Sequence, residues 1–194
     1  AAGNINSLTG RLALFATAVV LVAMTFRRDH GAVHRLFPTR PLSLNRTVGT
    51  AYWIMFLFTF THSSIGVFIP LVVQVVHGAW PLIAGYFTTV MVISWTAATV
   101  AGAGLRGRAV RFVVGMAGVA LVVTTRPLPL LAGFICLAGR GIGSCLAHIV
   151  NWTMSAVDPG EESVTASSIP TVRSLGIAFG SSSAGLIANS AGLG

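Results

Sequence analysis

Six long apolar segments, separated by short links, restrict what this chain can fold into more strongly than any other feature of its sequence. A helix that crosses the hydrocarbon core of a bilayer needs about 20 mainly apolar residues. The chain has 194 residues, of which only 8% are charged, whereas soluble domains carry about 25%. These patterns predict an all-α polytopic membrane protein, a single transmembrane domain with about six spanning helices. The helices are expected near 8–26, 48–73, 80–104, 109–124, 128–152 and 165–190.

The arginines sit mostly in alternate links, which predicts the orientation. All 12 basic residues are arginines. The link 27–47 and the link 105–111 are rich in arginine, while the links near 74–79 and 125–127 are poor in charge. Arginine-rich links lie on the cytoplasmic side, so 27–47 is expected to be a cytoplasmic linker and the acidic link 153–163 to lie on the same side. This distribution predicts a multi-pass protein of the cell (inner) membrane in contact with lipid, and it excludes a nucleic-acid partner.

A polar stripe runs along the predicted helix 128–152. At 100° per residue, its polar side chains fall on one arc and its branched apolar side chains on the other. One arc is expected to look to lipid and the other to protein or a water-filled cavity. A charge at membrane depth suggests a function, so the stripe is a candidate substrate pathway with Arg140 as an anion or dipole anchor. Alternatively, Arg140 pairs with carbonyls at a helix break and His148 is an interior histidine. The candidates are Arg140, Ser144, His148 and Asn151.

A weaker polar stripe lies on the predicted helix 48–73, where the candidates for lining a pathway are Tyr52, Thr59, His62 and Ser63. Hydroxyl and imidazole groups between membrane helices also serve packing, so that alternative stays open. Pro70 should kink the outer end of this helix. The kink is either the hinge of a gate or a bend that only sets the course of the helix.

Three further features are expected to be structural. Gly176 and Gly180 form a small-residue packing pair on the last helix. Arg173, in the N-terminal part of the same helix, can extend to the cytoplasmic interface, with Glu161 or Glu162 as its expected partner. The two cysteines, Cys136 and Cys145, fall on opposite faces of one helix and cannot pair with each other. The sequence has no catalytic triad, phosphate loop or metal-ligand spacing, so no enzyme, cofactor or metal is expected.

The segment 156–185 resembles the major facilitator superfamily, most closely its fourteen-helix drug:proton antiporter branch. It reads AVDPGEESVTASSIPTVRSLGIAFGSSSAG. Three other features fit the same family. They are the motif FPTRPL in the linker, the sequence IPLVVQVVHGAWPLIAG at the end of the second helix, and the glycines Gly139, Gly141 and Gly143. The matching residues are Val157, Pro159, Glu161, Ala166, Ser167, Thr171, Arg173, Leu175, Gly176, Ala178, Gly180 and Gly185.

One link departs from the family pattern. The cytoplasmic loop between the third and fourth helices usually combines a glycine, an acid and several basic residues that hold one transport state. Here Arg106, Arg108 and Arg111 are present and the acid is absent. The resemblance therefore makes these arginines gating candidates and leaves the gating role of the loop in question.

The resemblance implies that the chain is roughly half of a major facilitator fold. In such transporters the substrate site lies near the midplane between two halves that rock against each other. The implied function is proton-coupled efflux of amphiphilic small molecules or drugs. An N-terminal half, or a second copy, would be the partner. Because no Asp or Glu lies within a predicted span, a coupling acid would belong to the missing half, or His62 and His148 would carry the proton. The alternatives are a stand-alone six-helix subunit that dimerises or docks on a partner, and a truncated transporter without function.

Overall fold

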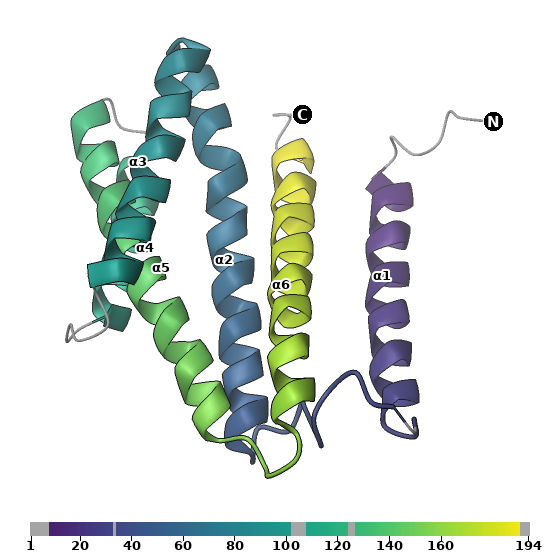
Figure 1. Cartoon of the computed structure of the whole chain (residues 1–194). Coiled ribbons are helices and arrows are strands. Elements are labelled where there is room, and N and C mark those ends of the chain that lie inside the picture. Colours follow the sequence, from purple (N-terminus) through teal and green to yellow (C-terminus); the bar gives the residue numbers. More distant parts are fainter. Residues whose placement is uncertain (1–7, 33, 102–107, 124–126, 191–194) are drawn as a thin grey trace. The chain divides into compact units, whose positions relative to one another are not determined.

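A computed structural model describes residues 8–32, 34–101, 108–123 and 127–190, and within these ranges every regular element is a helix. This confirms the predicted all-α class (Figure 1). The helices are α1 (Leu8–Asp29), α2 (Thr47–Val75), α3 (Pro81–Ala101), α4 (Arg108–Val122), α5 (Leu128–Ser155) and α6 (Glu162–Ser190).

Three of the described helices are long and apolar enough to cross a membrane. They are Thr47–Val75, Pro81–Val100 and Leu128–Ser155, and α4 adds a shorter apolar stretch at Val113–Val122. Both α2 and α6 have 29 residues, but α6 carries many serines and glycines that lower its hydropathy. The structure therefore supports a helical membrane protein, while six complete spans remain an expectation.

The helices belong to two compact units. The first unit comprises residues 1–64 and 153–194, and the second comprises residues 65–152. The first therefore holds α1, the linker, the first part of α2, the last three residues of α5 and everything that follows α5. The second holds the end of α2 with α3, α4 and most of α5.

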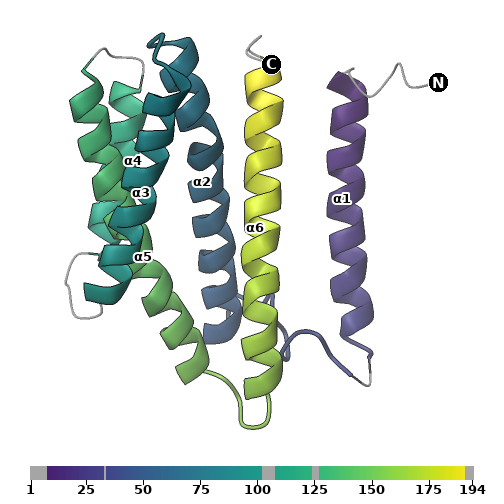
Figure 2. The ribbon, with the colours of Figure 1, turned by 45° about the horizontal axis from the view of Figure 1, so that its top comes forward.

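In the first unit, α6 packs closely against the first part of α2 and also contacts α1; Figures 1 and 2 both show it standing between these helices. The approach to α2 is made possible by glycines. A Cβ at Gly176 would lie 2.6 Å from the carbonyl oxygen of Phe56, and one at Gly180 would lie 2.9 Å from the carbonyl carbon of Phe60. The Ser63 hydroxyl donates to the Ile177 carbonyl oxygen at 3.1 Å. This confirms that the two glycines form a packing surface.

Acidic side chains join the linker after α1 to the acidic link 153–163 in the first unit. Glu161 accepts hydrogen bonds from the Thr39 backbone N–H, at 2.9 and 3.1 Å to its two oxygens, and from the Thr39 hydroxyl. Asp158 forms an ion pair with Arg46 at 2.6 Å. The linker and the acidic link 153–163 therefore lie at the same end of this unit, as the orientation argument expects.

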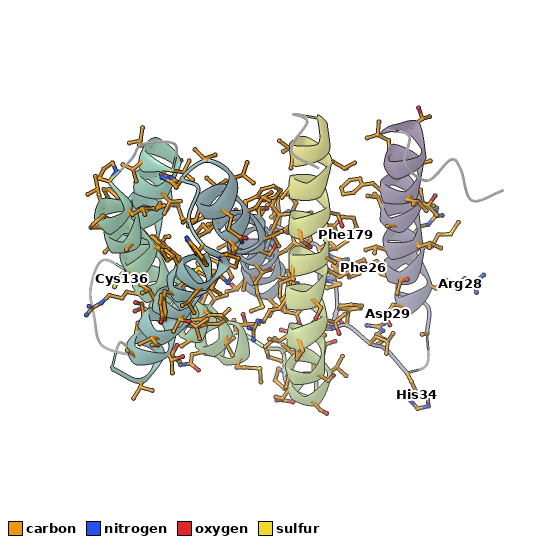
Figure 3. All side chains as sticks on the ribbon, turned by 90° about the horizontal axis from the view of Figure 1, so that it is seen from above. Phe26, Arg28, Asp29, His34, Cys136 and Phe179 are labelled. Carbon is orange, nitrogen blue, oxygen red and sulfur yellow. The ribbon has the colours of Figure 1, made fainter. Side chains whose placement is uncertain are left out.

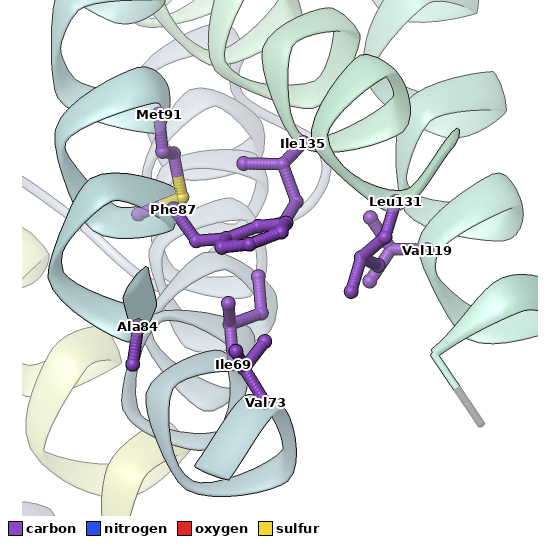
Figure 4. Packing of buried hydrophobic residues seen from close by; sticks show 8 residues of the cluster. All are labelled: Ile69, Val73, Ala84, Phe87, Met91, Val119, Leu131 and Ile135. Atoms are coloured by element: carbon purple, nitrogen blue, oxygen red, sulfur yellow. The ribbon is translucent and has the colours of Figure 1, made fainter. Parts of the chain in front are cut away.

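In the second unit, a cluster of buried apolar side chains joins the end of α2 with α3, α4 and α5 (Figure 4). Glycines again bring backbones together. A Cβ at Gly139 on α5 would lie 2.7 Å from the Met91 carbonyl oxygen on α3, and one at Gly115 on α4 would lie 2.6 Å from the Ala138 Cα on α5. The cluster consists of Ile69, Val73, Ala84, Phe87, Met91, Val119, Leu131 and Ile135.

The glycine contact between α2 and α6 leads to a stability prediction with a control on the same helix. We expect Gly176→Ala to lower the free energy of unfolding by about 1–3 kcal/mol, because the new methyl group meets backbone that cannot yield easily. Gly185→Ala adds the same group where nothing lies within 4 Å, so it should be neutral or slightly stabilising. Unfolding of the purified chain in mixed detergent micelles measures both. Equal effects would show that the close approach of α2 and α6 does not govern stability.

The two acidic contacts between the links should contribute unequally. Glu161→Gln removes the charge from three hydrogen bonds at a half-buried site, and we expect it to cost about 2 kcal/mol. Asp158→Asn breaks an ion pair whose side chains are 45% and 56% exposed, and we expect a cost below about 1 kcal/mol. The same unfolding assay ranks the two variants, and a larger effect of Asp158→Asn would contradict this assignment.

Candidate functional site

The apolar arc of α5 faces the protein interior. Ile135, Ile142, Leu146 and Ile149 are all buried within the chain. The expectation that this arc looks to lipid is therefore wrong. Gly139 and Gly143 contribute to this, because they let the backbone of α3 approach this part of α5 closely.

The polar arc of α5 consequently points away from the rest of its own unit. The side chains of Arg140, His148 and Asn151 are exposed. Yet more than half of the apolar stretch of this helix (56%) is buried inside the chain. Ser144 differs, because it is buried and donates its hydroxyl to the Arg140 carbonyl oxygen at 3.0 Å. Three of the four predicted residues thus share one open face, and the fourth bonds to its own helix.

The depth of Arg140 gives this face its significance. Arg140 stands 12 residues after Leu128 in a helix of 28 residues, which places it about 18 Å along a helix about 42 Å long. In the described part of the chain, no acidic side chain forms an ion pair with it. An arginine at membrane depth is costly unless it meets water or a polar partner. The face formed by Arg140, His148 and Asn151 is therefore the candidate functional site.

The polar residues of α2 have a different environment. Tyr52, Thr59 and Ser63 are buried. The Tyr52 hydroxyl lies 2.6 Å from the Ser168 Oγ of α6, and the Thr59 hydroxyl donates to the Met55 carbonyl oxygen at 2.9 Å. These positions favour the packing alternative for the three side chains. His62 is half-buried and lies within electrostatic range of Arg173.

Arg173 lies deeper in its helix than the sequence pattern indicates. Because α6 begins at Glu162, Arg173 stands three turns into the helix, about 16 Å from its start. The expected partners bind elsewhere: Glu161 binds Thr39, and Glu162 accepts the Gly160 backbone N–H at 3.0 Å. The Nε of Arg173 is buried without a hydrogen-bond partner among the described residues. The predicted pairing with Glu161 or Glu162 is therefore wrong.

The remaining candidates concern gating. Arg106 lies outside the described residues, and Arg108 and Arg111 lie on the first turn of α4 with side chains that are not described. Helix α2 continues through Pro70 to Val75, and Gln74 Nε2 donates to the Pro70 carbonyl oxygen at 3.1 Å. A second internal proline, Pro170 in α6, was missed in the sequence, although the motif SIPT marks it.

The remaining side chains to consider are those that could bind a metal ion and the two cysteines. Within the described ranges, no group of three or more His, Cys, Asp or Glu side chains could hold a metal ion. Neither Cys136 nor Cys145 forms a disulfide bond among the described residues, in agreement with their positions on opposite faces of the helix. The Ser94 hydroxyl lies 3.0 Å from the Cys136 sulfur, so this thiol belongs to the packing between α3 and α5.

Two curated proteins are similar to the chain, and both are described as "Probable multidrug-efflux transporter", from two strains of Mycobacterium tuberculosis. Each is 29% identical over 208 residues, which cover 96% of this chain and 42% of the relative. The chain thus spans about two fifths of the length of the curated relatives that it matches. No family model matches the chain, and no solved structure matches it.

The exposure of the α5 polar face leads to a labelling prediction. In a background with Cys136→Ala and Cys145→Ala, His148→Cys should react with a membrane-impermeant maleimide, because it would face water. Ile149→Cys, whose parent residue is 7% exposed, should not react. Ile93→Cys is the matched control, since Ile93 is 62% exposed but apolar and within a spanning helix, where lipid should exclude the reagent. Equal labelling at 93 and 148 in intact membranes would contradict a water-facing α5 face.

Proposed function

We propose that this chain forms part of a membrane efflux transporter and that the polar face of α5 lines its substrate pathway. The observation that carries the proposal is the exposure of Arg140, His148 and Asn151 on an otherwise apolar spanning helix. The similarity to probable multidrug-efflux transporters, which covers nearly the whole chain, supports a transport role. The resemblance of the segment 156–185 to the drug:proton antiporters of the major facilitator superfamily supports the more specific assignment.

The proposed architecture is half of a major facilitator fold whose cavity is completed by another segment. In such transporters, two halves enclose a site near the membrane midplane and expose it alternately to the two sides. Arg140 lies near the middle of α5, so its guanidinium would stand at the depth of that site. A matching half or a second copy would close the cavity over Arg140, His148 and Asn151.

The chemistry of the face suggests what it recognises. Arginine is always charged and offers only hydrogen-bond donors. His148 and Asn151 add groups that can donate or accept. This face therefore suits an amphiphilic small molecule that carries an anionic or acceptor group, with its apolar part against aliphatic side chains.

Proton coupling is part of the proposal and depends on histidine in this chain. All four acidic residues, Asp29, Asp158, Glu161 and Glu162, lie at helix ends or in links. Histidine is the side chain whose charge changes most readily between pH 5 and 8. His148, on the open face, is the first candidate for carrying a proton during transport, and His62 is the second. Arg106, Arg108, Arg111 and Pro70 remain the proposed gating residues.

A second candidate function is a six-helix subunit that dimerises or docks on a partner protein. The observation that favours it is the same exposed α5 face, because a partner with complementary polar groups would also satisfy Arg140. Crosslinking through Asn151→Cys in native membranes separates the two functions. A crosslinked pair without any substrate flux would support the subunit, and flux would support the transporter.

Flux measurements on Arg140 variants test the transporter assignment. In proteoliposomes that contain the native full-length protein, we expect Arg140→Leu to slow export of an anionic amphiphilic dye by about tenfold or more, since a hydrogen bond from a charged group contributes about 1.5–3 kcal/mol. Thr96→Ala is the control, because Thr96 is exposed on α3 and bonds only its own helix. Unchanged flux in Arg140→Leu would remove this face from the pathway.

The same liposomes test whether export is coupled to proton movement. An imposed proton gradient should accelerate export by the native protein, and His148→Asn should remove this acceleration while binding of the dye persists. Export that ignores the gradient in the native protein would rule out proton coupling. If the proton gradient still accelerates export by His148→Asn fully, the coupling site is His62 or a group elsewhere.

A further inference from the structure

Two neighbouring cavities lie at the cytoplasmic end of the first unit, and they differ in chemistry. The first, with a volume of about 300 Å³, is lined by α1, the start of α2, α6 and Leu42 of the linker. The second, with a volume of about 490 Å³, is formed by the end of α1 and the linker. Phe26 and Leu42 line both, so the two cavities adjoin.

The first cavity is apolar. Its α1 wall consists of Val19, Val22, Ala23 and Phe26, which recur at the spacing of one helix face. Figure 3 shows Phe26 and Phe179 on the facing sides of α1 and α6. Further along the same helices, the rings of Phe15 and Phe179 meet edge to face at 5.4 Å. The contact between α1 and α6 therefore leaves space between the two helices near Phe26.

The second cavity is basic. Its charged lining consists of Arg27, Arg35, Arg40 and Asp29. The carboxylate of Asp29 is already engaged, because it accepts the backbone N–H groups of Leu36 at 2.6 Å and Phe37 at 3.1 Å. Arg35 donates to the Thr39 hydroxyl at 3.0 Å, and Arg27 and Arg40 are exposed. Three guanidinium groups against one occupied carboxylate leave an excess of positive charge.

We propose that these adjoining cavities bind one anionic phospholipid of the cytoplasmic leaflet. Its acyl chain would occupy the apolar cavity between α1 and α6, and its phosphate would lie against the guanidinium groups of Arg27 and Arg40. A single ligand fits both cavities only if it joins an apolar tail to an anionic head, which is the chemistry of such a lipid.

The position of the cavities in the membrane agrees with this ligand. The arginine-rich linker marks the cytoplasmic side, where anionic lipids are abundant and where basic pockets beside membrane helices bind their headgroups. Trp53 lines the apolar cavity, is 37% exposed, and donates its indole N–H to the Leu42 carbonyl oxygen at 3.1 Å. Tryptophan is enriched at this headgroup level, so the rim of the cavity has the character of a lipid interface.

Trp53 provides the readout. With Trp80, Trp95 and Trp152 each replaced by phenylalanine, Trp53 is the sole tryptophan, and quenching of its fluorescence reports on brominated lipids in the apolar cavity. We compare brominated phosphatidylglycerol with brominated phosphatidylcholine in vesicles of unlabelled phosphatidylcholine. The site should prefer the anionic lipid at least fivefold, and equal quenching by the two lipids would overturn the proposal.

Matched arginine variants test the headgroup contact. Arg27→Gln and Arg40→Gln should each reduce the preference about fivefold, the loss expected for one basic residue near an anionic surface. Arg28→Gln removes the same charge from the neighbouring residue, which lines neither cavity and lies on the side of α1 away from α6 in Figure 3. It should change the preference less than twofold. An equal loss in Arg28→Gln would overturn the site in favour of general surface charge.

A second pair tests the acyl chain. Val22→Phe should fill the apolar cavity and reduce quenching by both lipids, because Val22 lines it. Leu21→Phe, at a residue that is 59% exposed and lines neither cavity, should leave quenching unchanged. Unchanged quenching in Val22→Phe would show that the acyl chain lies elsewhere and would overturn the proposal. The measurement involves no transport, so its result is independent of whether the proposed efflux is correct.

Discussion

The close approach of helix backbones at glycines is the contact on which the rest of this structure depends. Between membrane helices there is no gain from moving an apolar side chain out of water, so packing rests on van der Waals contact and hydrogen bonds. Gly176 and Gly180 bring α6 onto α2 in the first unit, and Gly139 brings α5 onto α3 in the second. These contacts set the rotation of each helix about its axis.

Helix rotation, in turn, divides the polar side chains into two groups. Tyr52 and Ser63 of α2 turn towards α6 and find hydrogen-bond partners on it. Arg140 and His148 of α5 turn outward, because the glycine-bearing and branched arcs of that helix are already in contact with neighbours. Similar stripes in the sequence therefore have opposite meanings. One is an interface within the chain, and the other is a face on which Arg140, His148 and Asn151 are exposed.

The distribution of charge follows the same division. The few acidic residues lie at helix ends or in links, where Asp29 accepts hydrogen bonds from the linker backbone and Glu161 joins two links. The charges that remain along the helices and in the linker are positive. This leaves a basic face near the middle of α5 and a basic cavity formed by the end of α1 and the linker. Both favour ligands with anionic or acceptor groups, although they belong to different units and to different proposed roles.

The sequence by itself determined the fold class, the approximate helix positions and the packing role of Gly176 and Gly180, because these depend on local composition and helical spacing. It identified Arg140 and His148 for the same reason. It could not decide which arc of α5 faces outward, since an apolar arc suits lipid and a helical neighbour equally well. Nor could it show that Glu161 binds Thr39, about 120 positions away along the chain, and leaves Arg173 without it. Those outcomes were decided only by the tertiary structure, because they depend on which backbones come close enough to cover one face and expose another.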